Sequence, residues 1–172
     1  KLDVTDRARF GALAGEVGKV HILVNNAGVS VFGPTDEARY DDYDWIIGVN
    51  FGGVINGLVS FLPSMKAHGE GGHIVNVASM AAYLSGPQAG IYTASKFAVR
   101  GLTESLRYNL APYNIGVSLM CPGLTKTNAW GSALRRPSAF AASGFAAPNS
   151  TELAQFGMAF ELGMEPIEVG RK

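Results

Sequence analysis

Three apolar runs rich in β-branched residues, separated by two long segments of helical character, constrain the fold of this chain most strongly. The runs are VHILVNNAG at 20–28, GHIVNVAS at 72–79 and IGVSLMCPG at 115–123. Each has the length and composition of a buried β-strand. Strand, helix, strand, helix, strand is the order in which helical crossovers join parallel strands. The sequence therefore predicts a doubly wound α/β fold with a parallel sheet covered by helices on both faces.

The two segments between these runs are predicted to be helices at about 36–68 and 92–112. Asp36 and Glu37 suit the start of the first helix, because carboxylates are stabilised at the positive end of a helix dipole. Pro63 is expected to kink or end this helix. The second helix has apolar or small residues at every fourth position, which form one inward stripe: Ala98, Leu102, Leu106 and Leu110.

Composition bounds the class of protein. The chain has 172 residues, of which 47% are hydrophobic and 16% charged, against about 25% charged in an average domain. We therefore treat residues 1–172 as one domain with a sizeable core. The formal net charge is zero and the basic residues are scattered, which argues against nucleic acid as a partner.

Membrane insertion, export and metal binding are not predicted. The longest apolar run, Val49–Pro63, falls short of the roughly 20 residues that cross a bilayer. The opening KLDVTDRARF carries charges where a signal peptide is apolar. Cys121, the single cysteine, fits a reducing compartment and a place in the core. The three histidines lack metal-ligand spacing, so we expect no metal site. Because neither a membrane span nor a signal peptide is predicted, we expect a cytoplasmic protein.

Glycine, proline and polar residues follow each predicted strand. NNAG closes the first run, NVAS the second and CPGLTKT the third. In open parallel sheets the ligand binds beyond the carboxyl ends of the strands, where the chain turns into loops. Glycine and proline allow sharp turns and a close approach of the backbone to a ligand. We therefore expect the site at this edge of the sheet.

The segment YTASK at 92–96 adds a pair of reactive side chains. Tyr92 and Lys96 lie four residues apart in a predicted helix, so they project from the same face. An ammonium group near a phenol favours the phenolate. Such a tyrosine can take a proton from an alcohol, or give one to a carbonyl, while a cofactor moves the hydride. Taken alone, the same spacing also fits an ordinary solvated helix face.

Further motifs stand in register with this pair. LVNNAG at 23–28, Asn50 in GVNFGG, Ser79 in NVAS and PGLTKT at 122–127, together with YTASK, resemble the short-chain dehydrogenase/reductase (SDR) family. The resemblance extends over most of the chain. It implies a Rossmann-type fold and a nicotinamide-dependent oxidoreductase that acts on a small-molecule alcohol or ketone, with a catalytic tetrad of Asn50, Ser79, Tyr92 and Lys96.

The resemblance also implies a role for each member of this tetrad. Tyr92 is the general acid/base, and Lys96 assists it while holding the ribose hydroxyls of the nicotinamide. Ser79 donates a hydrogen bond to the substrate oxygen and stabilises charge there. Asn50 anchors a water molecule that links Lys96 to solvent. A second interpretation of Asn50 is a polar residue that satisfies the backbone of an irregular helix.

Cofactor contacts follow from the same matching. Beyond Tyr92 and Lys96, the residues expected to contact NAD or NADP are Asp3, Val4, Asn26, Ala27, Gly28, Pro122, Gly123, Leu124, Thr125 and Thr127. The threonine hydroxyls suit helix caps equally well. Thr5 and Asp6 are expected to cap the next helix.

Some family features are not found in these residues. The family begins with a strand and a turn of the form T-G-x-x-x-G-x-G, which holds the pyrophosphate. This turn does not occur here, and KLDVTD matches the end of the family's third strand. We therefore expect a fold without the N-terminal glycine-rich βαβ portion and without the C-terminal end. The residue that separates NAD from NADP use falls in the missing portion, so the choice between the two stays open.

Residues 128–165 match the region in which this family varies its substrate lid. Trp130, Phe140, Phe145, Phe156 and Phe160 lie there among glycines and alanines, which suits a mobile cover for an apolar substrate or aromatic packing beneath a loop.

Two longer stretches resemble one branch of the family in particular. YDDYDWIIGVNFGGVINGLVSFLP and LRRPSAFAASGF are similar to the Cα-dehydrogenases that oxidise benzylic alcohols of lignin β-aryl ethers. Arg135 and Arg136 of the second stretch are interpreted as a solvated loop face, with contact to a phosphate or a substrate acid as the alternative.

Two classes of function remain. The motifs favour an active dehydrogenase/reductase, whereas the absent glycine turn favours a catalytically silent relative, or an inactive fragment, that acts as a binding or assembly module. The resemblance also implies that subunits pair through the helices at 36–68 and 92–112 into a homotetramer or homodimer.

Overall fold

The computed structural model describes residues 2–171 and contains a parallel three-stranded sheet in the order β1-β2-β3. The strands are β1 (Ile22–Asn25), β2 (Gly72–Val77) and β3 (Ile115–Met120). Ile22 pairs with His73, and Ile74 pairs with Val117. The three predicted strands are confirmed. Each ends a few residues earlier than the apolar run does, because the residues that follow turn out of the sheet into the site.

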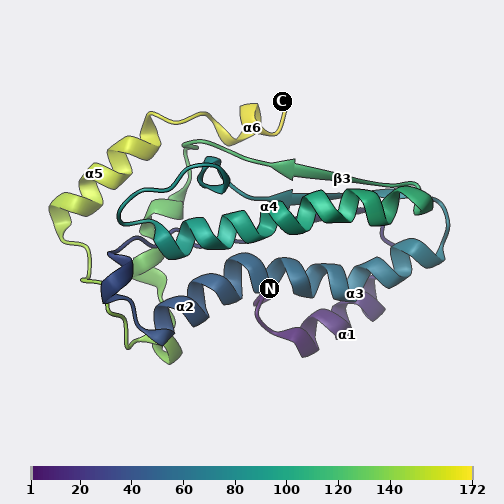
Figure 1. The fold of residues 1–172 in the computed structure, drawn as a ribbon, viewed down its shortest axis with the longest axis horizontal. Coiled ribbons are helices and arrows are strands. Elements are labelled where there is room, and N and C mark those ends of the chain that lie inside the picture. Colours follow the sequence, from purple (N-terminus) through teal and green to yellow (C-terminus); the bar gives the residue numbers. More distant parts are fainter. Residues whose placement is uncertain (1, 172) are drawn as a thin grey trace.

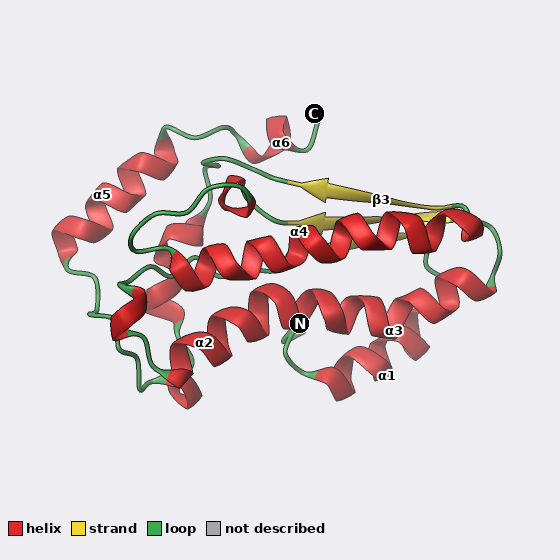
Figure 2. Ribbon diagram, in the orientation of Figure 1, coloured by secondary structure: helices red, strands yellow, loops and turns green. Residues whose placement is uncertain are grey.

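Helices occupy most of the remaining chain (Figure 2). The α-helices are α1 (Arg7–Val17), α2 (Tyr40–Ile47), α3 (Gly53–Ala67), α4 (Gly90–Leu110), α5 (Ser150–Glu161) and α6 (Pro166–Val169), and the π-helical segment η2 (Gly48–Gly52) joins α2 to α3. The 3₁₀ segments are η1 (Thr35–Glu37), η3 (Met80–Ala82), η4 (Ala111–Tyr113), η5 (Asn128–Arg135) and η6 (Ser138–Phe140). The chain therefore has the predicted alternation of strands and helices.

The first long helix differs from its prediction at two points. Asp36 and Glu37 lie in the separate turn η1, and α2 begins at Tyr40, capped by Arg39 and Asp42. Pro63 does not end the helix, because α3 continues to Ala67. A proline removes one N–H from the helix. The apolar face of α3 stays packed in the core on both sides of that position.

Helices α3 and α4 pack on the same face of the sheet. The core cluster joins Val54 and Leu58 of α3, Ile74 of β2, Val99 of α4 and Val117 of β3. Leu102 and Leu106 pack against it and Leu110 is part of it, which confirms the predicted stripe of α4 at these three positions. Both crossovers run in one direction along the sheet, so right-handed connections bring both helices to one face (Figure 1).

The opposite face of the sheet carries Ile22 and Val24, which are 67% and 54% exposed. Among residues 2–171, helices therefore cover one face of the sheet, and α1 packs on the outer side of α3 through Phe10 and Phe61. The α/β class with parallel strands and flanking helices is confirmed, whereas the expected cover on both faces is not present within the part of the chain that the structure describes.

A buried polar network crosses the core between the strands and α4. Asn25 donates to the side-chain oxygen of Asn76 at 2.8 Å, and Asn76 donates to the hydroxyl of Thr103 at 3.0 Å. Thr103 donates in turn to the carbonyl of Val99 at 2.6 Å. Gly57 of α3 faces Asn25 so closely that a Cβ there would lie 2.2 Å from its Oδ1. This network fixes the spacing of β1, β2 and both helices.

The continuous helix over Tyr40–Ala67 is long and apolar enough to cross a membrane by length and composition. Half of its most apolar window is buried inside the molecule. Buried core helices meet the same criterion, and the packing of α3 in the core accounts for its apolar character.

Candidate active site

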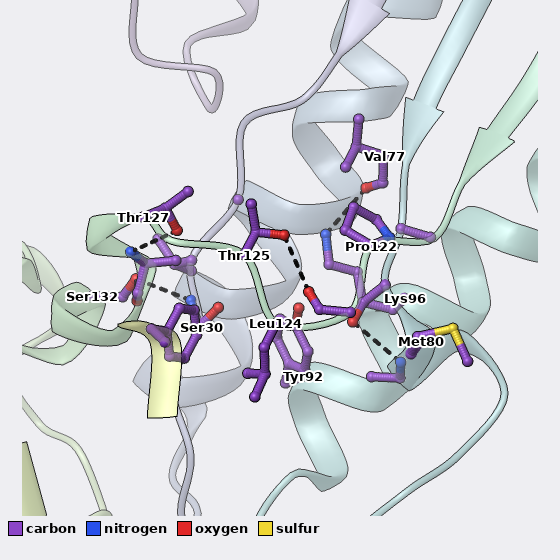
Figure 3. A pocket seen from close by; sticks show the side chains of 18 of the residues that line it. Ser30, Val77, Met80, Tyr92, Lys96, Pro122, Leu124, Thr125, Thr127 and Ser132 are labelled. Carbon is purple, nitrogen blue, oxygen red and sulfur yellow. Dashed lines mark hydrogen bonds between the residues drawn. The ribbon is translucent and has the colours of Figure 1, made fainter. Parts of the chain in front are cut away.

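A cavity of about 1170 Å³ opens beyond the carboxyl ends of the strands (Figure 3). The strand arrowheads point toward this end of the molecule, where α5 lies (Figure 2). Loops that follow all three strands line the cavity, together with the first turns of α4. It includes these sequence-predicted residues: Asn26, Ala27, Gly28, Ser79, Tyr92, Lys96, Pro122, Gly123, Leu124, Thr125 and Thr127. The sheet edge on which the sequence placed the site is therefore the one that carries the cavity.

Lys96 lines the floor of the cavity, and the residue as a whole is buried, at 4% exposure. Its Nζ donates to the carbonyl of Val77 at 3.2 Å and lies 5.7 Å from the centre of the Tyr92 ring. Burial lowers the pKa of Lys96 to about 8. Within residues 2–171 the Val77 carbonyl is the one acceptor of this ammonium, so further N–H groups remain for a ligand in the cavity. Tyr92 and Lys96 are neighbours, as their spacing predicts.

Ser79 begins the turn that follows β2. Its Oγ accepts from the backbone N–H of Ala81 at 3.1 Å, which leaves the hydroxyl hydrogen to donate into the cavity. The N–H of Met80 donates to the carbonyl of Pro122 at 3.0 Å. The loops after β2 and β3 are thereby held together, and Ser79 faces the same space as Tyr92.

Asn50 lies in the π-helical segment and is buried. Its Oδ1 accepts from the N–H of Val29 at 2.7 Å. Its Nδ2 donates to the carbonyl of Val29 at 3.1 Å and to Ser95 Oγ at 3.1 Å. Asn50 therefore clamps the loop after β1 to α4. It satisfies the backbone of that loop, whereas the second interpretation from sequence placed such bonds in its own irregular helix.

Gly28 sits directly above this clamp. A Cβ at this position would lie 3.3 Å from Asn50 Oδ1 and 3.4 Å from Lys96 Nζ. Because glycine has no side chain, the backbone of the loop comes close to the lysine ammonium and leaves it open to a ligand. The resulting cradle joins the end of β1 to the proposed tetrad.

The hydroxyls after β3 are partly used within the chain. Thr127 Oγ1 accepts from the N–H of Ala129 at 3.4 Å and caps η5, and Thr125 Oγ1 donates to the carbonyl of Gly123 at 3.3 Å. The Thr127 contact agrees with the helix cap that the sequence allowed as the alternative. Cofactor contacts of the two threonines stay a prediction.

Asp3 and Val4 do not line the cavity. Asp3 Oδ1 accepts from the N–H and the hydroxyl of Thr5 at 2.9 and 2.8 Å, and the hydrogen bonds from Thr5 lower its pKa. The carbonyl of Val4 accepts from Asn56 at 2.8 Å. Their assignment to adenine therefore stays a prediction. Asp6 caps α1 by accepting from the N–H of Arg9, as expected.

Aromatic residues from distant segments meet at the cavity. The Phe32 ring lies 5.5 Å from the Tyr92 ring, edge to face, and 6.2 Å from that of Phe156 in α5. Phe32 and Trp45 line the cavity but were missed by sequence analysis. Phe32 could have been predicted as a cavity residue, because it is an aromatic residue in the loop that follows NNAG. Of the predicted lid aromatics, Phe160 lines the cavity, whereas Phe140 and Phe145 pack beneath their loop.

The two arginines of the lid differ. Arg135 is exposed and lines the cavity, where its Nη2 donates to the carbonyl of Asn128 at 3.1 Å. Arg136 forms an ion pair with the buried Asp42 at 2.7 Å. The interpretation of Arg136 as part of a solvated face is therefore wrong, because its guanidinium is held inside the molecule.

One cluster of potential ligands lies outside the cavity lining. His21, His68 and Glu70 bring their ligand atoms within 4.8 Å of one another, which their spacing did not predict. Both nitrogens of His68 are engaged, with the carbonyl of Val20 at 3.0 Å and the N–H of Glu70 at 3.1 Å. Hydrogen bonds from Lys19 and His21 lower the pKa of Glu70 to about 2. The neighbouring ammonium opposes a cation, and these bonds account for the cluster.

Residues 1–137 match the family model described as short chain dehydrogenase. The chain belongs to the short chain dehydrogenase family.

Curated relatives of this short chain dehydrogenase include two named enzymes. It is 41% identical to C alpha-dehydrogenase from Sphingobium sp. strain SYK-6 over 170 residues, covering 96% of this chain and 55% of that protein. It is 37% identical to trans-4-hydroxycyclohexanecarboxylate dehydrogenase from Sinomonas cyclohexanicum over 130 residues, covering 73% of this chain and 49% of that protein. The chain spans about half the length of these curated relatives.

Solved structures of similar proteins share the fold. A short chain dehydrogenase/reductase from Burkholderia phymatum in complex with NAD is 39% identical, with a TM-score of 0.88, covering 98% of this chain and 63% of that one. The apo form of LigO from Sphingobium sp. strain SYK-6 is 41% identical, with a TM-score of 0.76, covering 99% of this chain and 56% of that one. The Rossmann-type fold is thereby confirmed for the part that the chain spans.

Proposed function

We propose that this short chain dehydrogenase is an NAD(P)-dependent oxidoreductase that interconverts a hydrophobic secondary alcohol, such as an aromatic one, and its ketone. The observation that carries the proposal is the meeting of Ser79, Tyr92 and Lys96 at one cavity beneath the Gly28 cradle. The named relatives support the reaction class, since each is a dehydrogenase.

The residues at the cavity fit a nicotinamide dinucleotide. The open Gly28 cradle and the spare N–H groups of Lys96 suit the ribose hydroxyls, and the loop from Pro122 to Thr127 supplies backbone and hydroxyl groups beside them. A bound dinucleotide would supply or accept the hydride. Similar structures are described with NAD and with NADP, which supports either cofactor.

Each proposed catalytic side chain handles a proton or a charge at the substrate oxygen. Tyr92 takes the hydroxyl proton of the alcohol during oxidation and returns it to the ketone oxygen during reduction. The Lys96 ammonium stabilises the negative charge that forms on the Tyr92 oxygen. Ser79 donates its free hydroxyl hydrogen to the substrate oxygen as charge develops there. Asn50 holds the loop that places these groups together.

The cavity wall favours an apolar substrate. Its non-polar lining includes Phe32, Trp45, Leu84, Met120 and Phe160, and its charged lining residues within 2–171 are Lys96 and Arg135. The likeness to C alpha-dehydrogenase supports an aryl alcohol as the first class to test.

We also propose that the protein self-associates as a homotetramer or homodimer in the cytoplasm. A shallow groove on α3 supports self-association, because it is lined by apolar residues that include Leu58, Leu62 and Tyr113 beside Val59, which is 69% exposed. Sedimentation of the protein and of Val59→Glu tests this, since a charge in a buried contact shifts the species toward monomer.

The full-length protein tests the function directly. Reduced nicotinamide formed from NAD or NADP with a panel of aryl and alkyl secondary alcohols is followed by absorbance. We expect turnover that falls by about 10²-fold or more in Tyr92→Phe and Ser79→Ala, with dinucleotide binding retained. Binding of neither dinucleotide by the native protein would favour the silent binding or assembly module.

A further inference from the structure

The carboxylate of Asp42 accepts four hydrogen bonds in a fully buried position, at 0% exposure. Oδ1 accepts from Arg136 Nη2 at 2.7 Å and from Ser143 Oγ at 2.6 Å. Oδ2 accepts from the N–H of Arg39 at 3.0 Å and from the N–H of Gly144 at 2.9 Å. A buried carboxylate needs such compensation, because removal of its partners leaves an uncompensated charge inside the protein.

Helix capping explains only one of these four bonds. The bond from Arg39 completes the N-terminal cap of α2. The other three come from residues 136–144, about a hundred positions further along the chain. The neighbouring Asp41 adds a bond of 2.8 Å from the N–H of Ala142. The start of α2 is therefore built to hold a distant segment as well as itself.

The held segment fits closely against the loop before α2. A Cβ at Gly144 would lie 1.7 Å from the carbonyl oxygen of Glu37, so the backbones can approach only at glycine. A Cβ at Gly33 would lie 2.3 Å from the Phe145 ring. Residues 136–145, here termed the lid base, are thus fixed by both polar and apolar contacts.

The lid base contacts the wall of the cavity. The guanidinium of Arg136 lies 4.7 Å from the centre of the Trp45 ring, and Trp45 lines the cavity one helical turn after Asp42. Phe145 packs against the cluster that contains Trp45 and Ile91. Ile91 directly precedes Tyr92. Movement of the lid base would therefore change the positions of the aromatic wall and of the helix start that carries Tyr92.

We propose that Asp42 is a positioning residue that pins the lid base to α2 and thereby sets the size of substrate that the cavity accepts. The inference rests on the proposed function and goes beyond it by naming the residue that shapes the substrate side. Asp42 acts through Arg136 and Trp45 and does not touch the reacting atoms. Removal of a lid-base contact should reduce discrimination between large and small alcohols more than it reduces turnover.

The kinetic test uses Ser143→Ala and Asp42→Asn in the full-length protein, with Arg136→Gln as a third variant that is more liable to misfold, because it leaves the buried Asp42 charge without its cation. We expect KM for a bulky aryl secondary alcohol to rise about tenfold relative to a small alkyl secondary alcohol. The kcat values and dinucleotide affinity should change less than about twofold, because the proton-handling groups are untouched. Arg9→Gln, which breaks the exposed pair with Glu16, is the matched control and should leave all values unchanged.

A second measurement does not require turnover. In a Trp130→Phe background the remaining tryptophan is Trp45, whose emission should shift in Arg136→Gln and should report equilibrium binding of an aryl ketone. A shifted Trp45 emission together with weaker ketone binding in Arg136→Gln supports the proposal, even if the protein oxidises no alcohol. Absence of alcohol oxidation would overturn only the proposed function. Equal changes in KM for large and small alcohols, or unchanged ketone affinity in a shifted Trp45 spectrum, would overturn the proposal.

Discussion

Lys96 combines a proposed catalytic role with a destabilising position. Burial lowers its pKa to about 8 from the value of 10.5 for a free lysine, so its charge is disfavoured in the folded protein. The difference corresponds to about 3 kcal/mol. Below pH 8 the full penalty is present, and it is relieved as pH rises toward 10.5 because the folded protein loses the proton first.

Lys96→Met should therefore separate stability from activity. We expect its free energy of unfolding at pH 7, measured with urea and without dinucleotide, to equal or exceed that of the native protein. Its advantage should shrink between pH 8 and 10.5, and its oxidoreductase activity should be lost. A stability deficit of constant size across that range would contradict the assignment of the low pKa to burial.

Asn50 is expected to matter for the loop rather than for a proton. Asn50→Ala removes three hydrogen bonds and leaves the Val29 N–H without its side-chain acceptor, so unfolding should become easier by about 1–3 kcal/mol. Dinucleotide affinity should fall with it, because the Gly28 cradle rests on this clamp. Ser95→Ala removes only one of the three bonds of Asn50. It should therefore have the smaller effect on the stability measured by scanning calorimetry and on the dinucleotide affinity measured by titration calorimetry.

At the scale of elements, α3 and β1 are spaced by a glycine. Gly57→Ala would place a Cβ 2.2 Å from Asn25 Oδ1 and disturb the network that runs through Asn76 to Thr103. We expect a loss of about 1–3 kcal/mol from overpacking, measured by urea unfolding. Gly101→Ala in α4 is the matched control, since a Cβ there meets nothing within 4 Å and should stabilise the helix by about 0.5–1 kcal/mol. Equal effects of the two variants would rule out close packing as the cause.

For the whole molecule, Asp42 predicts part of the acid sensitivity. Burial by itself raises the pKa of this carboxyl, but hydrogen bonds from Arg39, Ser143 and Gly144 and the charge of Arg136 outweigh burial, so the pKa is lowered. A lowered carboxyl pKa gives stability that is present above the unfolded value of about 3.9 and is lost as pH falls through the folded value. In thermal melts below pH 4, Asp42→Asn should lose less stability than the native protein does. If the melting temperatures of both proteins fall equally with pH below 4, the acid sensitivity belongs to other carboxyl groups.

The features of the fold and the site that the sequence predicted correctly are those that a local sequence pattern encodes. The strands, α4 and the neighbouring Tyr92 and Lys96 follow from periodicity and spacing within single segments. The ion pair between Asp42 and Arg136 joins residues 94 positions apart and leaves no periodic signal in the sequence. The sequence therefore predicted an exposed position for Arg136. The π-helical segment under Asn50 and the grouping of His21 with His68 depend likewise on which elements pack together. Such contacts follow from tertiary packing, which a single sequence does not display.

The lid base also bears on how this scaffold can be re-engineered. Residues 136–145 are bonded to α2 through the buried carboxylate of Asp42. Replacing them would leave this buried charge without its partners and would destabilise the folded domain. The chain from residue 146 through α5 has no such attachment to Asp42. A library of variants with new alcohol preferences should therefore vary residues after Phe145 and keep residues 136–145 unchanged.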